Sequence, residues 1–311
     1  MNALHIPCTS IAPVLHGLPA KKTGMRQTQA LERHLGDITR RHLPVPLAEL
    51  VMFILKQAWA CLFAILLLIA IIGTKAIWQQ DWPLARYDAL VIIAISIQIG
   101  MLFFKLETWD EAKVILLFHV TGTAMELFKV NAGSWAYPEP GILKVMGVPL
   151  FSGFMYAAVG SFMARVIRLF DMTFAPFPPF WAHIALAVAI YVNFFAHHFI
   201  FDTRYVLFVL TLVLYARTKI WFRIGENWYW MPLPLAAFLS SVCLWIAENI
   251  GTSTGTWIYA GQNMLEMVNI AKMGSWYLLL YVSFATVTLV FRTALRQDPV
   301  SQQPTPELQT G

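Results

Sequence analysis

Long apolar runs alternate with short polar segments along most of the chain. Each run approaches the roughly 20 residues that an α-helix needs to cross the hydrocarbon core of a bilayer. The pattern therefore predicts an all-α fold, a polytopic transmembrane helix bundle with about eight spans. The predicted spans are residues 50–73, 86–104, 112–130, 149–169, 180–198, 204–221, 233–250 and 275–294.

Polar segments flank this transmembrane domain, which we place at residues 48–296. Residues 1–47 spread their basic residues through a mostly polar stretch and lack the short apolar core of a signal peptide. We expect this segment to be a cytoplasmic polar tail with a helix near 25–42. Residues 297–311 are polar and rich in Gln and Pro, and they predict a disordered tail.

Composition favours lipid as the solvent of this chain. Hydrophobic residues make up 58% of it and charged residues 13%, about half the charged share of an average soluble protein. The net charge of +5 lies beside the apolar spans, which fits membrane lipids as partners and argues against nucleic acid. The three cysteines, Cys8, Cys61 and Cys243, follow no disulfide or zinc spacing.

The distribution of basic residues predicts the orientation. With the N-terminus in the cytoplasm, 16 of the 22 Lys and Arg residues lie on the inner side of the predicted spans. Cytoplasmic loops carry such an excess. We therefore expect a multi-pass protein with both termini in the cytoplasm.

Two stretches of the sequence match at one internal spacing of 122 residues. In each, a glutamate is followed by Gly, Ser or Thr, Trp and Tyr: Glu126 with Gly133, Ser134, Trp135 and Tyr137, and Glu248 with Gly255, Thr256, Trp257 and Tyr259. Arg-Tyr pairs upstream also match. The pattern predicts repeats at about 50–169 and 180–294. Because each repeat has four spans, the two are parallel, and both aromatic loops lie at the outer face.

Glu126 and Glu248 are the candidate catalytic residues. A carboxyl at this depth is costly and usually faces a bundle interior or a cavity. Either each glutamate caps its own loop, or the two form a proton-handling or substrate-orienting pair. Lys129 is close enough in sequence to form an ion pair with Glu126. The equivalent position in the second stretch is Gly251, which carries no charge. We therefore expect Glu248, with no local cation, to be the general acid.

Further candidates for substrate binding surround these glutamates. The aromatic loops form either a binding rim or an ordinary interfacial belt. His119 lies seven residues before Glu126 and either extends a polar track or bonds to a neighbouring helix. The candidate substrate-binding residues are Trp135, Tyr137, Trp257, Tyr259, Asn249 and His119.

The polar segment between the fifth and sixth spans offers weak metal ligands. His197, His198 and Asp202 lie in it, and His198 and Asp202 would share one side of a continuing helix. Imidazole and carboxylate suit zinc. The alternatives are an ion pair between Asp202 and Arg204, or simple solvation of this segment at the membrane interface.

The motifs as a set resemble a known family. NFFAHHFIFDTRY, GSWAYPEPG and ENIGTSTGTWIYAGQ resemble the bacterial membrane proteins grouped as domain of unknown function 817, over about residues 47–296. The resemblance implies a multi-span inner-membrane protein and carries no activity or cofactor. The stretch from Glu248 to Tyr259 is also similar to a glutamate-glycine-aromatic-tyrosine signature of membrane carotenoid hydratases and cyclases, which protonate isoprenoid double bonds.

These observations leave three kinds of function open. The first is a membrane-embedded enzyme that acts on a lipid or isoprenoid through the paired glutamates. The second is a transporter with a site between two parallel repeats, and the third is a scaffold in a membrane complex. The sequence has no phosphate-binding GxxxxGK[ST] loop, which argues against ATP-driven pumping. The cofactor and the oligomeric state stay open.

Overall fold

The computed structural model describes residues 25–79, 81–196, 199, 201–225, 227–263 and 266–296. Helices make up most of this part. They are α1 (Met25–His42), α2 (Val45–Ala60), α3 (Leu62–Ile77), α4 (Arg86–Phe103), α5 (Trp109–Asn131), α6 (Phe151–Leu169), α7 (Phe180–Ala196), α8 (Arg204–Tyr215), α9 (Leu233–Ser253), α10 (Ala271–Val290) and the short 3₁₀ helix η1 (Arg292–Ala294).

Short antiparallel strands add to the helices, so the expectation of a purely all-α fold was incomplete. β1 (Trp135–Ala136) pairs with β7 (Ile258–Tyr259), and β2 (Lys144–Val145) pairs with β3 (Val148–Pro149). A third sheet has the order β4 (Thr173–Ala175), β5 (Lys219–Ile224), β6 (Asn227–Pro232).

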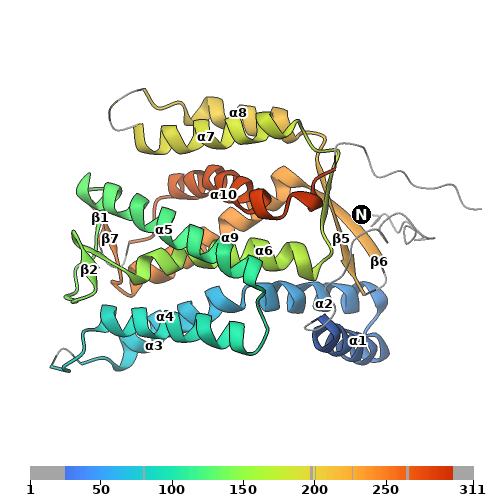
Figure 1. Cartoon of the computed structure of the whole chain (residues 1–311), viewed down its shortest axis with the longest axis horizontal. Helices are drawn as coiled ribbons and strands as arrows, with labels where there is room; N and C mark the ends of the chain where they lie inside the picture. Colours follow the sequence, from blue (N-terminus) through green and yellow to red (C-terminus); the bar gives the residue numbers. More distant parts are fainter. Residues whose placement is uncertain are drawn as a thin grey trace, which may run out of the picture.

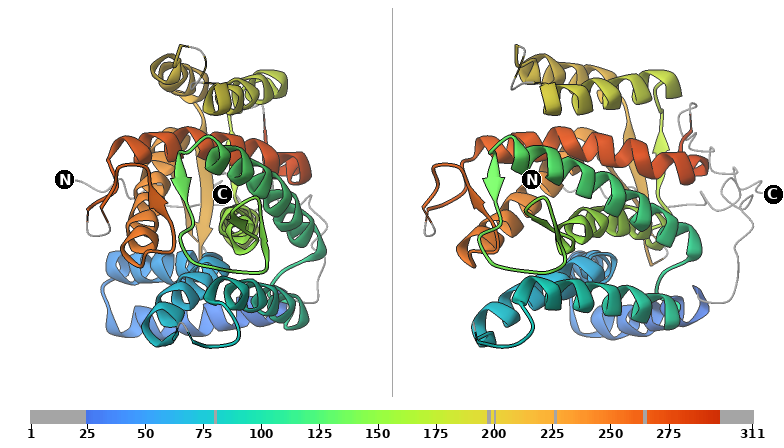
Figure 2. Two further views of the ribbon diagram at one scale, coloured as in Figure 1. Left: turned by 90° about the vertical axis from the view of Figure 1, so that its left-hand side faces the viewer. Right: turned by 60° about the vertical axis from the view of Figure 1, so that its left-hand side comes forward.

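The helices form three layers whose axes share one general direction (Figure 1). Helices α5, α6, α9 and α10 form the middle layer. The α3–α4 pair covers one side of it and the α7–α8 pair covers the other, as both views in Figure 2 also show. Strands β1 and β7 lie at one end of the bundle, and β5 and β6 lie at the opposite end (Figure 1).

Several helices have the length and composition of membrane spans. These are α4, α5, α9 and α10, and the bent pair α2–α3 adds a fifth if it forms one span. Helices α7 and α8 are apolar but shorter. Large apolar side chains are exposed along the bundle, as at Ile99, Leu116 and Val213. These features indicate a membrane protein, although four or five candidate spans are fewer than the eight predicted.

The predicted helix near 25–42 is confirmed as α1. It packs beside α2, where Arg40 forms an ion pair with Glu49 at 3.1 Å and Lys56 reaches back to Glu32 at 2.9 Å. The Lys56 ammonium also donates to a backbone carbonyl of β5. Helix α1 is thereby fixed to the same end of the bundle as the β5–β6 hairpin.

The first predicted span, residues 50–73, is broken rather than continuous. Helices α2 and α3 meet at Cys61 with a bend of 69°. The buried Arg165 side chain of α6 donates to the carbonyl oxygens of Trp59 at 2.6 Å, Ala60 at 3.2 Å and Leu106 at 2.7 Å. A side chain that satisfies freed carbonyls is a recognised cause of a kink without proline.

The sixth predicted span, residues 204–221, was wrong at its C-terminal end. Helix α8 ends at Tyr215, and β5 begins at Lys219. Residues along β5 alternate between half-buried and buried positions. That period of two belongs to a strand with one covered face, which an apolar run alone does not distinguish from a helix.

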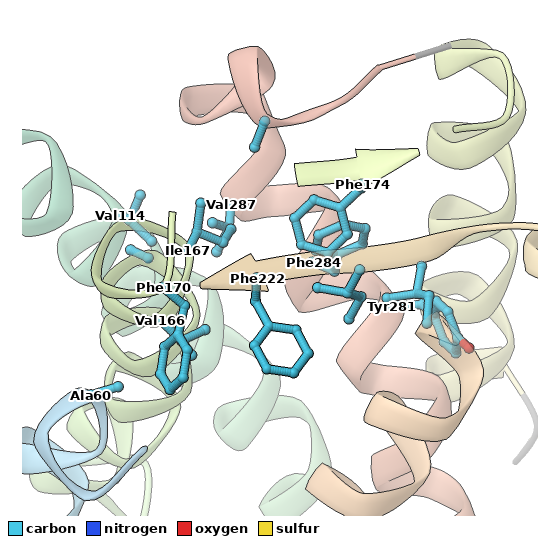
Figure 3. Close-up of a cluster of buried hydrophobic side chains, with 14 of the residues drawn as sticks. Ala60, Val114, Val166, Ile167, Phe170, Phe174, Phe222, Tyr281, Phe284 and Val287 are labelled. Carbon is cyan, nitrogen blue, oxygen red and sulfur yellow. The ribbon is translucent and has the colours of Figure 1, made fainter. Parts of the chain in front are cut away.

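Two hydrophobic clusters hold the layers together. Near the β5 end, the rings of Phe170, Phe174, Phe222, Tyr281 and Phe284 lie together (Figure 3). Phe170 directly follows α6, and the others come from β4, β5 and α10. The second cluster runs along α3 and α4 and includes Tyr87, Tyr137, Phe151 and Trp257. These four residues pack at the aromatic loops and fix their position.

Candidate functional site

The two aromatic loops lie side by side at one end of the bundle. Trp135 is opposite Tyr259 and Ala136 is opposite Ile258 in the β1–β7 ladder. The Trp135 and Tyr259 rings meet edge to face, with centroids 5.8 Å apart. The pairing brings together the helix ends that carry Glu126 and Glu248.

The Glu126 carboxyl is buried and fully engaged by donors. Only 2% of the residue is exposed. One oxygen accepts from the Trp135 indole at 2.7 Å and the Tyr137 hydroxyl at 2.9 Å, and the other accepts from the Tyr156 hydroxyl at 2.7 Å. Three donors on one carboxyl are what a buried acidic group requires when it acts only as an acceptor.

The Glu248 carboxyl has a different environment. The residue is 8% exposed, and the Tyr259 hydroxyl donates to it. It also interacts with the side chain of Trp276 and with the charges of Lys272 and Glu126. The Lys272 ammonium lies 4.1 Å from the centre of the Tyr259 ring. The site thus combines two carboxyls, one ammonium and a surrounding set of aromatic rings.

The expected ion pair between Lys129 and Glu126 was wrong. The Lys129 ammonium instead donates to the backbone carbonyl oxygen of Phe194 at 2.7 Å and lies 4.1 Å from the centre of its ring. Because Lys129 points toward α7, adjacency along α5 did not determine its partner. The cation near the pair is Lys272, which comes from α10 and interacts with Glu248. The predicted charge contrast is therefore reversed.

The loop tyrosines are suited to act as hydrogen-bond donors. Burial, and then the neighbouring Glu126 carboxyl, raise the pKa of Tyr137 well above its ordinary value. Burial and the Glu248 carboxyl do the same to the pKa of Tyr259. Both hydroxyls therefore stay protonated across the physiological pH range and donate hydrogen bonds to the carboxyls.

Helix α4 begins with three residues that clamp both loops, a role that the sequence did not reveal. Arg86 donates to Glu139 at 2.7 Å and to the Thr256 hydroxyl at 3.1 Å. The Tyr87 hydroxyl donates to the Thr256 carbonyl oxygen at 2.7 Å. Asp88 accepts two backbone N–H groups of the first loop. The repeated Arg-Tyr pair was visible as a match, but nothing in the sequence gave its partners.

Two other predicted substrate-binding residues, Asn249 and His119, are among the described residues and form no hydrogen bond with the Glu126 or Glu248 side chain. Asn249 donates to the Trp245 carbonyl oxygen at 2.7 Å and accepts from the Val268 N–H at 2.9 Å, which fixes the loop after β7. The His119 ring packs on Phe154, with centroids 4.3 Å apart. These contacts hold both side chains in place and do not test the predicted role in substrate binding.

The predicted metal ligands are only partly visible. His197 and His198 lie outside the described residues. Asp202 forms an ion pair with Arg204 at 2.6 Å and accepts from Asn193 at 3.2 Å, as the alternative interpretation expected. Across the part of the chain that the structure describes, no group of three His, Cys, Asp or Glu residues is placed to hold a metal ion.

Comparison with known proteins gives the family. The family described as "Protein of unknown function (DUF817)" matches residues 49–284, about three quarters of the chain. The chain belongs to the DUF817 family. This DUF817 protein is also similar to "Uncharacterized protein YoaT" of Bacillus subtilis (strain 168), with 43% identity over 240 residues that cover 77% of this chain and 90% of that protein. No solved structure matches.

The matched region of this DUF817 protein contains the whole carboxyl site. Every residue from the α4 clamp at Arg86 to Trp276 lies within it, whereas α1 lies before it. The likeness to carotenoid hydratases receives no support from these matches. The family thus agrees with the first resemblance and leaves the chemistry to be argued from the geometry.

Proposed function

We propose that this DUF817 protein is an inner-membrane enzyme that acts on a lipid or isoprenoid through Glu126 and Glu248. The observation that carries the proposal is the carboxyl pair itself. Two buried acids interact with each other among aromatic donors, and Glu248 also interacts with Lys272. Buried acids are costly to maintain for structure alone, and they favour an acid–base role.

An internal duplication supports this site. Ala136 and Ile258 face each other in the ladder and are 122 residues apart, the same spacing as Glu126 and Glu248. Trp135 is opposite Tyr259, which is the counterpart of Tyr137. A ladder centred on equivalent residues is what a pseudo-twofold axis along the bundle produces. We therefore propose eight spans in two parallel four-helix repeats, with α3–α6 and α7–α10 as the corresponding helices.

We further propose that the carboxyl site faces the outside and that both termini are cytoplasmic. The basic residues of α1, including Arg33 and Arg41, lie at the end of the bundle opposite the aromatic loops. An excess of Lys and Arg marks the cytoplasmic side. Membrane lipids are the expected surroundings and source of substrate, and no nucleic-acid partner is expected.

In the proposed chemistry Glu248 is the general acid, because it accepts fewer hydrogen bonds than Glu126. The expectation that Glu248 has no nearby cation was wrong, since Lys272 interacts with it. The Glu248 proton passes to the substrate, and the carboxylate that remains is stabilised by the Tyr259 hydroxyl and by the Lys272 charge. Glu126 already accepts three hydrogen bonds, so in this proposal it stays a hydrogen-bond acceptor and transfers no proton. The cycle balances as an isomerisation: a C–H bond forms where the proton adds, a neighbouring C–H bond breaks, and the Glu248 carboxylate takes up the proton that is released.

A lipid comparison tests the enzyme. Deleting the gene should change the profile of extracted lipids and isoprenoids measured by mass spectrometry, and the wild-type gene should restore it. Glu248→Gln should fail to restore the profile while its expression and unfolding temperature stay normal. Glu266→Gln, which changes an exposed loop carboxyl, should restore it. An unchanged profile after deletion would contradict the proposal.

A transporter is the second candidate, because the site contains residues from both proposed halves, as in transporters with parallel repeats. In that case, uptake of a labelled solute into membrane vesicles would be lost with Glu248→Gln or Glu126→Gln, and the lipid profile would stay constant. A scaffold would tolerate both substitutions in both assays.

A further inference from the structure

A groove runs along the bundle next to the carboxyl pair. It lies between α5, α6, α7 and α10, and its walls include Thr121, Gly122, Tyr191, Val282 and Thr286. Helices α5 and α10 are both candidate spans, so this groove lies at the depth of the hydrocarbon. Thr121 on its wall is exposed, which leaves the groove open toward lipid.

One end of the groove reaches the carboxyls through two aromatic side chains. Tyr156 and Trp276 both line it, and their ring centroids lie 6.1 Å apart at an angle of 36°. The Tyr156 hydroxyl donates to Glu126, and the Trp276 side chain interacts with Glu248. The same two side chains therefore contact the groove on one side and the carboxyls on the other.

The groove is shallow and suits one hydrocarbon chain that lies along it. From Trp276 to Thr286 the wall follows eleven residues of α10, roughly 15 Å from the first to the last at the rise of an α-helix. Its volume is only about 50 Å³, so a bound chain keeps one side against the walls and the other toward lipid. Two parallel acyl chains of a phospholipid do not suit so small a groove.

We propose that this groove holds the chain of an isoprenoid substrate and that Tyr156 and Trp276 hold the reacting end of the chain at the carboxyls. The inference rests on the proposed enzyme and names its substrate class. Phe118, Tyr156, Tyr191 and Trp276 all line the groove. Their ring faces pack well against the flat double bonds that recur along an isoprenoid chain, in addition to the area they bury. A saturated acyl chain offers no such planes.

Photochemical labelling tests the groove. The purified full-length protein, in liposomes of phosphatidylethanolamine and phosphatidylglycerol, is irradiated with a geranylgeraniol or a hexadecanol that carries a diazirine at the chain end. The geranylgeraniol probe should label peptides that contain Tyr191 or residues 282–286, and excess unlabelled geranylgeraniol should abolish the labelling. Equal labelling by hexadecanol, or labelling that does not saturate, would overturn the proposal.

A pair of matched variants locates the binding. Ser283→Trp fills the groove from α10, and it should lower labelling by about tenfold, the effect of a 1.4 kcal/mol loss. Ser96→Trp makes the same change on an exposed face of α4, and it should leave labelling unchanged. Equal losses in both variants would argue against a site in the groove. The competition by unlabelled geranylgeraniol on the wild type decides the matter even if Ser283→Trp does not fold.

The outcome separates the groove from the enzyme. Glu248→Gln should keep the labelling and lose turnover, because Glu248 does not line the groove. Saturable labelling combined with a lipid profile that ignores gene deletion would leave the groove in place and remove the enzyme. A profile that responds to deletion, without labelling of the groove, would do the reverse.

Discussion

The two Arg-Tyr pairs that open α4 and α8 have the same sequence and opposite surroundings. Arg86 is 4% exposed and Tyr87 is fully buried, and together they hold both aromatic loops. Tyr205 is 78% exposed, and Arg204 pairs only with the nearby Asp202 among its described ion pairs. The carboxyl site is therefore supported from one side of the bundle. Matching sequence in the two proposed repeats does not give the two Arg-Tyr pairs the same contacts.

The residues one helical turn after the two glutamates also differ in their surroundings. Gly251 leaves room for the ring of Trp257, since a Cβ there would come within 1.8 Å of that ring. The equivalent position in the first half, 122 residues earlier, is Lys129. There the corresponding indole, Trp135, donates to Glu126 instead. The two carboxyls thus have different environments, and the residue one turn away is glycine beside Glu248 and lysine beside Glu126.

The largest expected difference between the halves concerns the two arginines. Arg86→Ala should destabilise the protein by roughly 3 kcal/mol, because it removes a buried ion pair and leaves Glu139 with only a weaker partner. Arg204→Ala should cost less than about 1 kcal/mol, because its ion pair is partly exposed. Thermal unfolding in detergent measures both. Equal losses would remove the asymmetry between the clamps.

A smaller effect is expected at the glycine beneath Trp257. Gly251→Ala should cost about 1–3 kcal/mol, because the new methyl group overlaps the indole. Gly100→Ala on α4 is the control, since nothing lies within 4 Å of its added Cβ, and alanine favours a helix over glycine by about 1 kcal/mol. Unfolding temperatures should move in opposite directions. A neutral Gly251→Ala would show that Trp257 does not need this space.

The smallest effect concerns the pH dependence of stability at the junction between α4 and α5. In the proposed second repeat the corresponding junction, between α8 and α9, is the β5–β6 hairpin. Burial raises the pKa of Glu107 above its ordinary 4.5, although Ser161, Gln98 and Arg165 favour its charged form and Glu111 opposes it. Since the folded state holds this proton more tightly, its contribution is complete below about pH 4.5 and decreases as pH rises toward the folded pKa.

Substitution of that carboxyl tests the pH dependence. Glu107→Gln should flatten the decline of the unfolding temperature as the pH rises above about 4.5. Asp110→Asn changes an exposed carboxyl on the next helix and should leave the decline in place. A wild-type curve that is already flat would mean that Glu107 keeps its ordinary behaviour in the folded protein.

Much of the helical framework followed from the apolar pattern. Helices α4, α5, α9 and α10 lie within a few residues of their predicted spans, and α1 matches its predicted range. These segments are long or strongly patterned, so local preferences and burial agree. The bend at Cys61 was not predicted, because its cause is Arg165, which is about 100 residues away in the sequence.

The site was predictable in its members but not in its contacts. The recurrence of Glu126 and Glu248 with their aromatic loops identified most of the residues that meet. The partners of Lys129 and Lys272 depend on how α5, α7 and α10 pack, and no local spacing encodes that. Tyr156 and Trp276 belong to no motif found in the sequence, and only the fold places them beside the carboxyls.

The ladder between β1 and β7 has an evolutionary consequence under the proposed duplication. A Trp-x-Tyr strand that sets Trp against Tyr about its own midpoint is complementary to a second copy of itself. Two identical ancestral chains can therefore assemble the same pair of acids as an isologous dimer. Fusion of the two genes then frees each copy to change separately, as the lysine and the glycine beside the two acids have done.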